Sequence, residues 1–568
     1  MRTVPSQAPG EPEDASIPTS ASGAPRVRLP DVGRGHASST ASTSARRRAL
    51  PTATSKLASQ RIWLRVLVFV GGLVSLSLEM CATRLLAPFF GTTLFVWANV
   101  IGLVLIYLSA GYYLGGRLAD RYPTPRVLCA LCAIAALAIG LIPFISEPVL
   151  QWSVRGLSEV NVGIVVSSFV AVILLFSVPI VLLGLVSPYA VRLSMDSIDS
   201  SGRRVGNLYA LSTMGSIAGA FLPVLVLIPS WGVRRTLLFC AVALLAASLW
   251  GLWPRLRLAA SIPGVLLLLP LALPQVAPLG PLKPEPGLIA YQESLYNYIQ
   301  VVQQPDGTRE LVLNEGQAIH SIYRPDQVLT GWYWDYFLAA PYFNAGPATS
   351  QVHRVGIIGL AGGTIAREFT AAYGPVPIDG VEIDPAIVAV GRKYFGMTEP
   401  NLHVFVADGR PFIRTTNATY DVIAIDAFQQ PYIPFQLTTV EFFQELRAHL
   451  SPHGVICLNA GHTRTDFRLI QAFVNTLHQV FPSVYTFNVP NTFNTEIMAT
   501  VQPTSLSTFQ ANMSAIPADT LLGTVAQEVA PVAQVAPAQP GGIVFTDDRA
   551  PVEQLIDQLL IDYVQQGG

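Results

Sequence analysis

The sequence predicts a two-part chain, in which a multi-pass α-helical membrane domain precedes an α/β domain built on a parallel sheet. Two observations support this prediction. Charged residues make up only 12% of the 568 residues and hydrophobic residues 51%, whereas soluble proteins carry about 25% charged residues. This charge deficit is confined to residues 62–276, and beyond residue 352 short apolar runs alternate with helical patterns, as a parallel sheet requires.

Residues 1–60 are rich in Ser, Ala, Pro, Thr and Arg and contain few large apolar side chains. Such a segment buries too little surface to offset the entropy of ordering it, so we expect a disordered basic tail. No apolar core of a cleavable signal appears in its first 30 residues. Basic residues next to the first apolar run favour a cytoplasmic tail: Arg46, Arg47, Arg48, Lys56, Arg61 and Arg65.

Residues 61–277 are expected to form a transmembrane domain of six or seven helices in the cell membrane. Six apolar runs are long enough to span a bilayer, at residues 62–85, 96–116, 127–146, 163–190, 206–229 and 235–253. Small residues between Tyr209 and Ala220 favour close helix packing. A seventh, proline-broken run at 260–276 permits either a span or a re-entrant segment, and this choice sets the side of the membrane on which the rest of the chain lies.

Two features of the composition argue against other classes of function. The net charge of −1 provides no global field that favours nucleic acid. Cys129 and Cys132 have CxxC spacing, but they stand in an apolar run with no second pair and no nearby His. We therefore interpret them as packing residues and expect no metal site.

Residues 278–350 are expected to contain a stiff proline-rich linker followed by a small β subdomain. Prolines recur through the first part of the segment. Residues 291–303 and 309–313 alternate with period 2 around the turn Pro305-Asp306-Gly307, and therefore predict two strands. An aromatic helix is expected at residues 331–337.

Residues 351–568 are expected to form a Rossmann-like α/β domain of the class I methyltransferase type. Val355–Ile358 is a buried-strand pattern, followed by a turn with Gly359, Gly362 and Gly363, a helix, and a second strand that ends at Glu382. This βαβ unit is typical of sites for adenosine-bearing cofactors. Strands are expected near 355–358, 378–382, 403–406, 420–426 and 455–459; residues 503–540 are uninformative, and 543–563 predict a strand, an acidic turn and a helix.

Polar residues follow several of these strands, and in an open α/β sheet the ligand lies at the carboxyl ends of the strands. Glu382 can hold both ribose hydroxyls. Asp408 can accept from an adenine amino group, or cap a helix, and Gly409 leaves room for the base. Asp426 ends the fourth strand, where the reactive end of a cofactor is expected.

The segment from about Tyr291 to Asn459 resembles the spermidine/spermine synthase (polyamine aminopropyltransferase) family. The whole chain resembles its membrane-fused branch, in which a block of helices precedes the synthase-like domain. The matching motifs are Glu293-Ser-Leu-Tyr-Asn297, Leu311-Val-Leu-Asn314, the Gly359 loop with Arg367-Glu368, Val381-Glu-Ile-Asp384, Asp408-Gly409, Asp421-Val-Ile with Asp426, Leu450-Ser-Pro-His-Gly454 and Thr546-Asp547-Asp548.

The resemblance implies transfer of an aminopropyl group from decarboxylated S-adenosylmethionine to a diamine such as putrescine. It implies Asp426 as the proton acceptor, Glu382 as the ribose ligand, Asp408 and Gly409 as adenine contacts, and Asn297 as a residue near the thioether. The donor is a co-substrate, and no tightly bound cofactor is expected. The remaining expected partners are the lipid bilayer and the diamine, and the sequence leaves a homodimer open.

The amine half of the implied site departs from the family pattern. Gly362 stands where the family has an Asp that binds the aminopropyl ammonium, and Gln429 stands where it has a second Asp after the catalytic one. The family's Tyr-His pair reads Trp334-Asp335, so Asp335 is a candidate to restore one charge near the substrate. Fewer carboxylates near a dication weaken its binding, by on the order of 1–4 kcal/mol for each close pair.

Three functions therefore remain open at the level of sequence. The first is the aminopropyltransferase. The second is an S-adenosylmethionine-dependent methyltransferase, because Gly362 suits a cofactor that retains its carboxylate. The third is a membrane transporter or sensor with a non-catalytic adenosyl- or polyamine-binding domain, which the membrane half and the loop Gly115–Arg121 favour. An enzyme with this donor needs its catalytic domain in the cytoplasm, where the donor is made.

Overall fold

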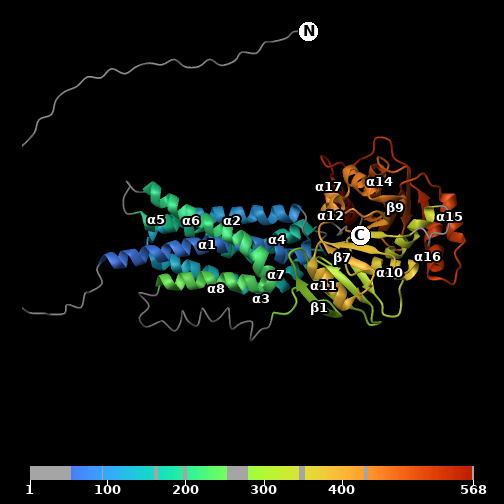
Figure 1. Ribbon diagram of the computed structural model, residues 1–568. Helices are drawn as coiled ribbons and strands as arrows, with labels where there is room; N and C mark the ends of the chain where they lie inside the picture. The colour runs from blue at the N-terminus through green and yellow to red at the C-terminus, as the bar shows by residue number, and fades with distance from the viewer. Residues whose placement is uncertain are drawn as a thin grey trace, which may run out of the picture. The chain divides into compact units, whose positions relative to one another are not determined.

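The computed structural model describes residues 53–91, 94–158, 164–195, 201–252, 279–316, 318–344, 352–427 and 433–565. Its described part confirms the predicted fold class. An N-terminal helical region with six candidate membrane spans is followed by a small antiparallel sheet and a larger α/β sheet (Figure 1).

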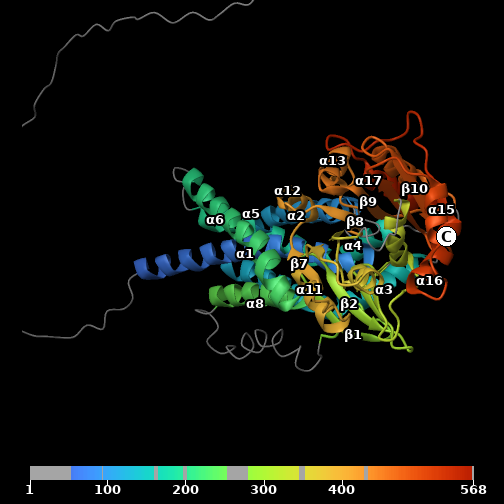
Figure 2. The ribbon, with the colours of Figure 1, turned by 45° about the vertical axis from the view of Figure 1, so that its right-hand side comes forward.

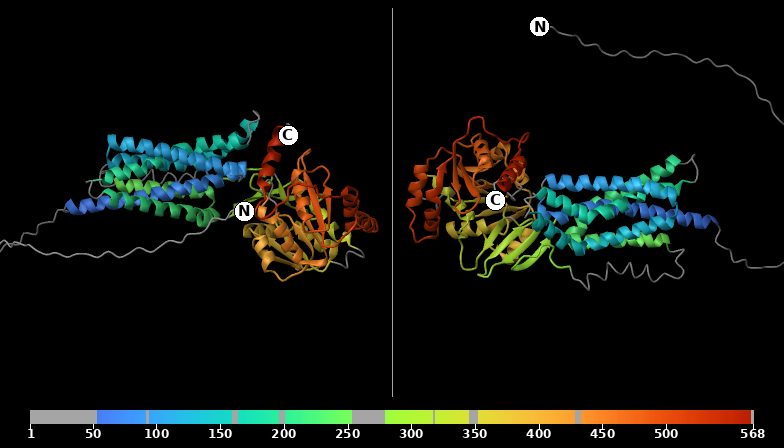
Figure 3. Two further views of the ribbon diagram at one scale, coloured as in Figure 1. Left: turned by 90° about the horizontal axis from the view of Figure 1, so that it is seen from above. Right: turned by 180° about the vertical axis from the view of Figure 1, so that it is seen from behind.

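The helical region contains α1 (Ala53–Phe90), α2 (Leu94–Arg121), α3 (Pro125–Ser158), α4 (Ile164–Gly184), α5 (Val186–Ser194), α6 (Ser201–Leu222), the π-helix η2 (Pro223–Leu227), α7 (Ile228–Trp231) and α8 (Val233–Leu252). Each of the six expected apolar runs overlaps a candidate span, and the mean hydropathy of the spans is between 1.5 and 3.0. The helices run alongside one another in both views of Figure 3, with α3 against α4 and α8, and α2 against α4. These six spans indicate a multi-pass membrane protein.

Helix α1 begins earlier than the sequence predicts. Residues 53–60, which we expected in the disordered tail, belong to helix α1. Ala53, Lys56, Leu57 and Ala58 are good helix formers, so the helix of the apolar span extends back through them. The seventh run at 260–276 lies outside the described residues.

Glycines in α6 bring this helix into close contact with α1. A Cβ added at Gly215 would lie 2.0 Å from the carbonyl oxygen of Phe69, and one at Gly219 would lie 2.1 Å from that of Leu73. The two backbones therefore touch at these positions, as small residues allow between membrane helices. The predicted role of the small residues at 209–220 is confirmed here.

The small sheet contains four antiparallel strands in the order β1 (Leu288–Glu293), β2 (Tyr298–Gln303), β3 (Arg309–Leu313) and β4 (Ile319–Tyr323), and β1 and β2 lie side by side in Figure 2. Our prediction of one strand over 291–303 was wrong. The chain turns at Ser294–Asn297, where Ser294 N donates to the carbonyl oxygen of Asn297 at 2.8 Å. Strand β4 was not predicted, and the aromatic segment forms the 3₁₀ helix η4 (Tyr333–Phe343).

The large sheet has eight strands in the order β12-β10-β11-β9-β8-β5-β6-β7. Their bounds are β5 (Val355–Ile358), β6 (Ile378–Glu382), β7 (Leu402–Val406), β8 (Tyr420–Ile425), β9 (Leu450–Gly461), β10 (Ser483–Asn488), β11 (Asn494–Thr500) and β12 (Ala533–Val535). Strands β5 to β9 pair in parallel, whereas β10, β11 and β12 pair antiparallel. The five predicted strands are confirmed.

Alternate residues of the central strands pack into two cores, one on each face of this sheet. One core joins the sheet to η4, α10 (Thr364–Tyr373), α15 (Leu506–Ser514) and α16 (Leu521–Val529). The other joins it to α12 (Gly409–Thr415), α13 (Val440–Ala448), α14 (Arg468–Leu477) and α17 (Val552–Gln565). Helix α11 (Pro385–Tyr394) packs on the small sheet.

The C-terminal segment differs from expectation in one respect. The strand predicted after Ile543 does not form. Phe545 N donates to the Thr476 hydroxyl at 3.0 Å, and its carbonyl oxygen accepts from Val440 N at 2.9 Å, so helix termini satisfy these backbone groups in place of a neighbouring strand. The closing helix is present as α17.

We predict that Gly219→Leu destabilises the helical region, because the added side chain must force α6 away from α1. The matched control is Gly206→Leu in the same helix, where an added Cβ meets nothing within 4 Å. The melting temperature of the detergent-solubilised protein should fall by several degrees for G219L and stay near wild type for G206L. Equal melting temperatures for the two variants would contradict the packing described.

Candidate active site

A pocket opens at the carboxyl ends of the parallel strands β5, β6, β7 and β8. Six of the eight site residues predicted from the sequence and placed by the structure line it. They come from the small sheet, the glycine-rich turn and the ends of three further strands: Asn297, Gly359, Glu382, Asp408, Gly409 and Asp426. The topology therefore brings these six residues together at one edge of the sheet.

The glycine-rich turn places the backbone of β5 against that of β8. Gly359 has a φ of 88°, in the region that favours glycine. A Cβ at this position would lie 2.5 Å from the carbonyl oxygen of Asp426. Gly362, in contrast, does not line the pocket: its N donates to the Ser321 hydroxyl at 2.8 Å, and an added Cβ would lie 2.9 Å from Ser321 Cβ. The turn therefore has no room for a side chain at position 362.

Glu382 ends β6 with its carboxylate held by two backbone donors. Oε2 accepts from Ala361 N at 2.9 Å, and Oε1 accepts from Asp384 N at 3.0 Å. The residue is 7% exposed, and burial raises the pKa of its carboxyl group. Each oxygen keeps a second lone pair, so the oriented carboxylate can still accept two hydroxyl groups from the pocket.

Asn297 and Asp408 also hold fixed orientations at the rim of the pocket. The Asn297 amide donates to Asp384 Oδ2 at 2.9 Å, and its Oδ1 accepts from Asn314 Nδ2 at 3.0 Å. Asp408 caps α12, with Oδ1 accepting from Arg410 N at 3.1 Å. It therefore acts as a cap and also lines the pocket, so the two roles weighed from the sequence are compatible.

Asp426 follows β8 and is partly exposed in the pocket. Trp334 Nε1 donates to its Oδ2 at 2.9 Å, the Tyr333 hydroxyl lies 3.4 Å from the same oxygen, and Asn459 also hydrogen-bonds the carboxylate. Desolvation outweighs these bonds and raises the pKa of Asp426 to about 7. A carboxyl group with this pKa can exchange a proton with a bound amine near neutral pH.

Asp335 lies elsewhere, although the sequence made it a candidate substrate residue. It is fully buried and does not line the pocket. Its carboxylate accepts from Thr330 N at 2.9 Å, from the Thr330 hydroxyl at 2.7 Å and from Gly331 N at 2.8 Å. This geometry supports a role in fixing the start of η4, which aims the adjacent Trp334 at Asp426. Gln429 lies outside the described residues.

Sequence reasoning missed four side chains of the site: Tyr333, Trp334, Asn459 and His320. Asn459 could have been found, because it stands at the end of a predicted strand next to that of Asp426. His320 lies on the unpredicted strand β4 and lines the pocket. Burial lowers its pKa to about 4, so the imidazole is neutral at neutral pH. Among the described residues, no group of three or more His, Cys, Asp or Glu side chains is arranged to hold a metal.

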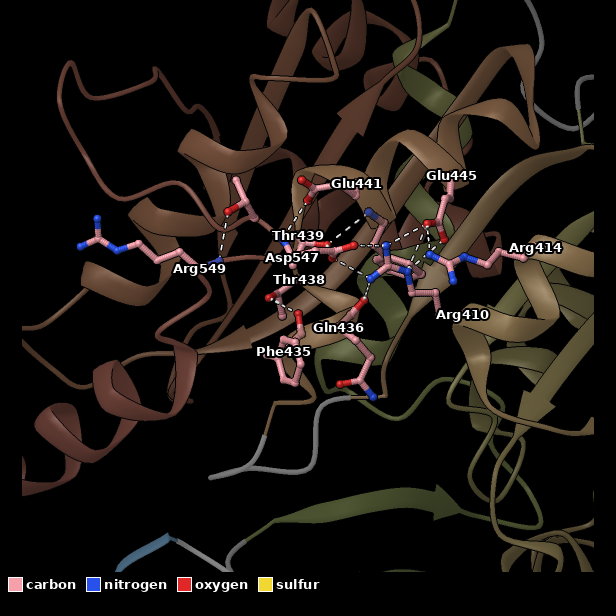
Figure 4. Close-up of polar contacts among 12 residues, drawn as sticks. Arg410, Arg414, Phe435, Gln436, Thr438, Thr439, Glu441, Glu445, Asp547 and Arg549 are labelled. Atoms are coloured by element: carbon pink, nitrogen blue, oxygen red, sulfur yellow. Dashed lines mark hydrogen bonds and ion pairs between the residues drawn. The ribbon is translucent and has the colours of Figure 1, made fainter. Parts of the chain in front are cut away.

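An ionic network centred on the buried Arg410 fixes the pocket wall beside Asp408 (Figure 4). Arg410, the second residue of α12, is 7% exposed and donates to both Glu445 and Asp547 through paired contacts of 2.7 to 3.2 Å. It also donates to the carbonyl oxygen of Gln436, a pocket residue, at 3.2 Å. The bidentate pairs give the guanidinium a fixed orientation, so Arg410 ties the pocket wall to the C-terminal segment.

The same network gives the Thr546-Asp547-Asp548 turn a structural role. Asp547 accepts from the Thr439 hydroxyl at 2.7 Å, and its N donates to Glu441 Oε2 at 3.0 Å. Hydrogen bonds from Arg410 lower the pKa of Asp547. Because its folded-state pKa lies below the unfolded value, this contribution to stability is present above the unfolded pKa and is lost as pH falls through the folded pKa.

We predict that Arg410→Lys lowers the melting temperature and weakens nucleoside binding, because a lysine cannot reach both carboxylates and the Gln436 carbonyl group at once. Arg414→Lys is the matched control, since Arg414 also binds Glu445 but is exposed. Calorimetry with 5′-methylthioadenosine and thermal melting measure the two effects. Unchanged affinity in R410K would show that the network does not shape the pocket.

Comparison with known proteins identifies the family. The spermine/spermidine synthase domain model matches residues 345–511. A probable polyamine aminopropyl transferase from Bifidobacterium longum is 36% identical over 48% of this chain and 64% of its own length. The polyamine aminopropyltransferase of Vibrio vulnificus is 30% identical over 39% of this chain and 75% of its own.

A solved structure is also similar, at a score too low to bear on function. The probable spermidine synthase of Corynebacterium glutamicum has 20% sequence identity and a TM-score of 0.37, over 47% of this chain and 97% of its own. The curated sequences are the informative matches, and this chain spans about two thirds of the length of the Bifidobacterium relative. Six long apolar helices precede the matched domain. The chain belongs to the polyamine aminopropyltransferase family, whose matched members are enzymes.

Proposed function

We propose that the protein is a membrane-bound aminopropyltransferase that moves the aminopropyl group of decarboxylated S-adenosylmethionine to a diamine of the putrescine class. The observation that supports this most directly is Asp426, a carboxyl group in the pocket with a pKa raised to about 7. Family membership supports the class of reaction, and the six pocket residues supply groups for both substrates.

The adenosine half of the site has the donors and acceptors that the nucleoside needs. Glu382 accepts the two ribose hydroxyls with the lone pairs that its backbone donors leave open. Asp408 accepts from the adenine amino group. At Gly409 an added Cβ would lie 2.5 Å from Ile358 Cγ2, so the close packing behind the base requires glycine. Asn297 lies at the side of the small sheet, where the thioether is expected.

The reaction is a displacement at carbon. The lone pair of the acceptor nitrogen forms a bond to the donor methylene attached to the sulfonium. The carbon–sulfur bond breaks, and its electron pair returns to sulfur to give neutral 5′-methylthioadenosine. The proton released by the attacking nitrogen moves to Asp426. Trp334 and Tyr333 orient the carboxylate for this step through their bonds to Oδ2.

One observation favours a second candidate, an S-adenosylmethionine-dependent methyltransferase. Position 362 carries no carboxylate and has no room for one, so the turn does not select a donor with a free aminopropyl ammonium. Mass spectrometry of the purified protein with each donor and several diamines separates the two. An aminopropylated amine supports the first candidate, and a methylated amine supports the second. Nucleoside binding without either product would support the non-catalytic sensor.

We predict that the acceptor kcat/KM falls as pH decreases through about 7, because Asp426 must be ionised to accept a proton. Asp426→Asn should lower kcat by about 10²- to 10⁴-fold and remove this acidic limb of the pH profile. Binding of 5′-methylthioadenosine by D426N, measured by calorimetry, should stay close to wild type. A pH profile that D426N leaves unchanged would assign the base to another group.

We further predict that the catalytic domain lies in the cytoplasm, where the donor is made. A green fluorescent protein fused after Gly568 should fluoresce, and an alkaline phosphatase fused at the same place should be inactive. The opposite pair of results would place the domain outside the cytoplasm and exclude the simple synthase function.

A further inference from the structure

Glu496 is a fully buried carboxyl group to which the proposed reaction assigns no role. It lies in the middle of β11 with 0% exposure, and neither of its oxygens has a hydrogen-bond partner among the described residues. Burying an unpaired carboxyl group in this way is costly, so the position of Glu496 needs a physical explanation. The strand pairing identifies the groups that lie near Glu496.

The strand register places Glu496 in one row with Asp426. Ile425 on β8 pairs with Leu458 on β9, so the next residue of each strand, Asp426 and Asn459, are neighbours. Asn459 pairs in turn with Glu496 on β11. Asp426, Asn459 and Glu496 thus form a row across three adjacent strands, two strand spacings wide, which is about 10 Å.

Asp426 interacts with both other members of the row, and Tyr333 and Trp334 contact its carboxylate. Asn459 hydrogen-bonds Asp426, whereas its Oδ1 has no partner among the described atoms. Desolvation, and then the charge of Asp426, raise the pKa of Glu496 well above its usual range. Burial, and then the charges of both carboxylates, raise the pKa of Tyr333, which contacts Asp426 from η4. The other titratable groups that interact with Glu496 are Tyr336 and Cys457, and neither is a cation.

We propose that Glu496 binds the distal ammonium of the diamine acceptor while Asp426 binds and deprotonates its attacking nitrogen. A dication along the row compensates two buried carboxyl groups, of which Asp426 raises the pKa of Glu496. Asn459 Oδ1, between them, accepts a further ammonium hydrogen. This inference rests on the proposed function and names the acceptor class as amines with two charged ends. It also supplies an anionic group that positions 362 and 429 do not.

The test compares Glu496→Gln with wild type in full-length, detergent-solubilised protein. The acceptors are putrescine and 1-aminobutane, which differ only in the distal amino group. Loss of a hydrogen bond to a charged group predicts that the KM for putrescine rises by about 10- to 100-fold in E496Q. The KM for the donor should change little, and the preference for putrescine over 1-aminobutane should largely disappear.

Two further variants separate binding from folding. Glu368→Gln is the matched control, because Glu368 is also buried with a pKa raised by desolvation but lies in α10 beside Asp335. E368Q should keep the putrescine preference. Glu496→Asp keeps the charge and should retain part of that preference. An unchanged putrescine KM in E496Q, or an equal rise in E368Q, would overturn the inference.

Failure of the proposed function gives a different result. If wild type forms no product with any amine, the aminopropyltransferase proposal fails. Calorimetric titration of putrescine into protein saturated with 5′-methylthioadenosine then tests Glu496 alone. Binding by wild type that E496Q loses supports the ammonium site, whereas equal binding by both proteins, or none by wild type, overturns it.

Discussion

The site depends on the close approach of two parallel strands, β5 and β8. Asp426 N donates to the carbonyl oxygen of Ile358 at 2.9 Å, and the backbone of Gly359 lies against that of Asp426 so closely that a Cβ would overlap it. This contact joins the glycine-rich turn to Asp426, the two parts of the site to which the proposed function assigns the nucleoside and the proton. A side chain at position 359 would separate the two halves of the site, so the glycine is required by packing as well as by its positive φ.

Around this contact the protein holds polar groups in costly positions. Asp426, Glu382 and Glu496 all have carboxyl pKa values raised by burial, so their ionised forms are less stable than in water. The Arg410 network has the opposite character, because each of its carboxylates meets a guanidinium. The charges of the Arg410 network are therefore paired, whereas Asp426, Glu382 and Glu496 have no salt-bridge partner among the described residues.

The sequence predicted the parts of the fold that have strong local patterns. Six apolar runs and the five parallel strands were identified, since both follow from composition and short periodicity. The strands β10 to β12 were missed, because their residues carry no Gly-rich motif. Strands β10 and β11 form an antiparallel hairpin, and β12 pairs with β10 from a distant part of the chain. The break at Ser294–Asn297 was missed for another reason: the Ser294 hydroxyl oxygen accepts from the backbone N of Tyr296 and of Asn297 to form that turn, and alternation alone does not reveal these bonds.

The candidate site was predictable to a similar degree. Residues at strand ends were found, because parallel topology brings strand ends together. Trp334 and Asp335 show the limit of this reasoning. They are adjacent in sequence, yet η4 turns the indole toward Asp426 and holds the carboxylate against Thr330 and Gly331. Glu496 could not be assigned at all without the pairing of β9 with β11.

The register across β8, β9 and β11 changes how the missing loop carboxylates are to be understood. In the family pattern, anionic groups at the glycine-rich turn and after the catalytic Asp meet the amines. Here position 362 has no room for one, while the sheet itself presents Glu496 in line with Asp426. A carboxylate fixed in the middle of a strand cannot turn to water when the site is empty, so its desolvation is already present before an amine binds. In the proposed function, part of the stability of the unliganded domain is exchanged for a preorganised row of carboxyl groups, and that row, rather than the turn, meets the two ends of the amine.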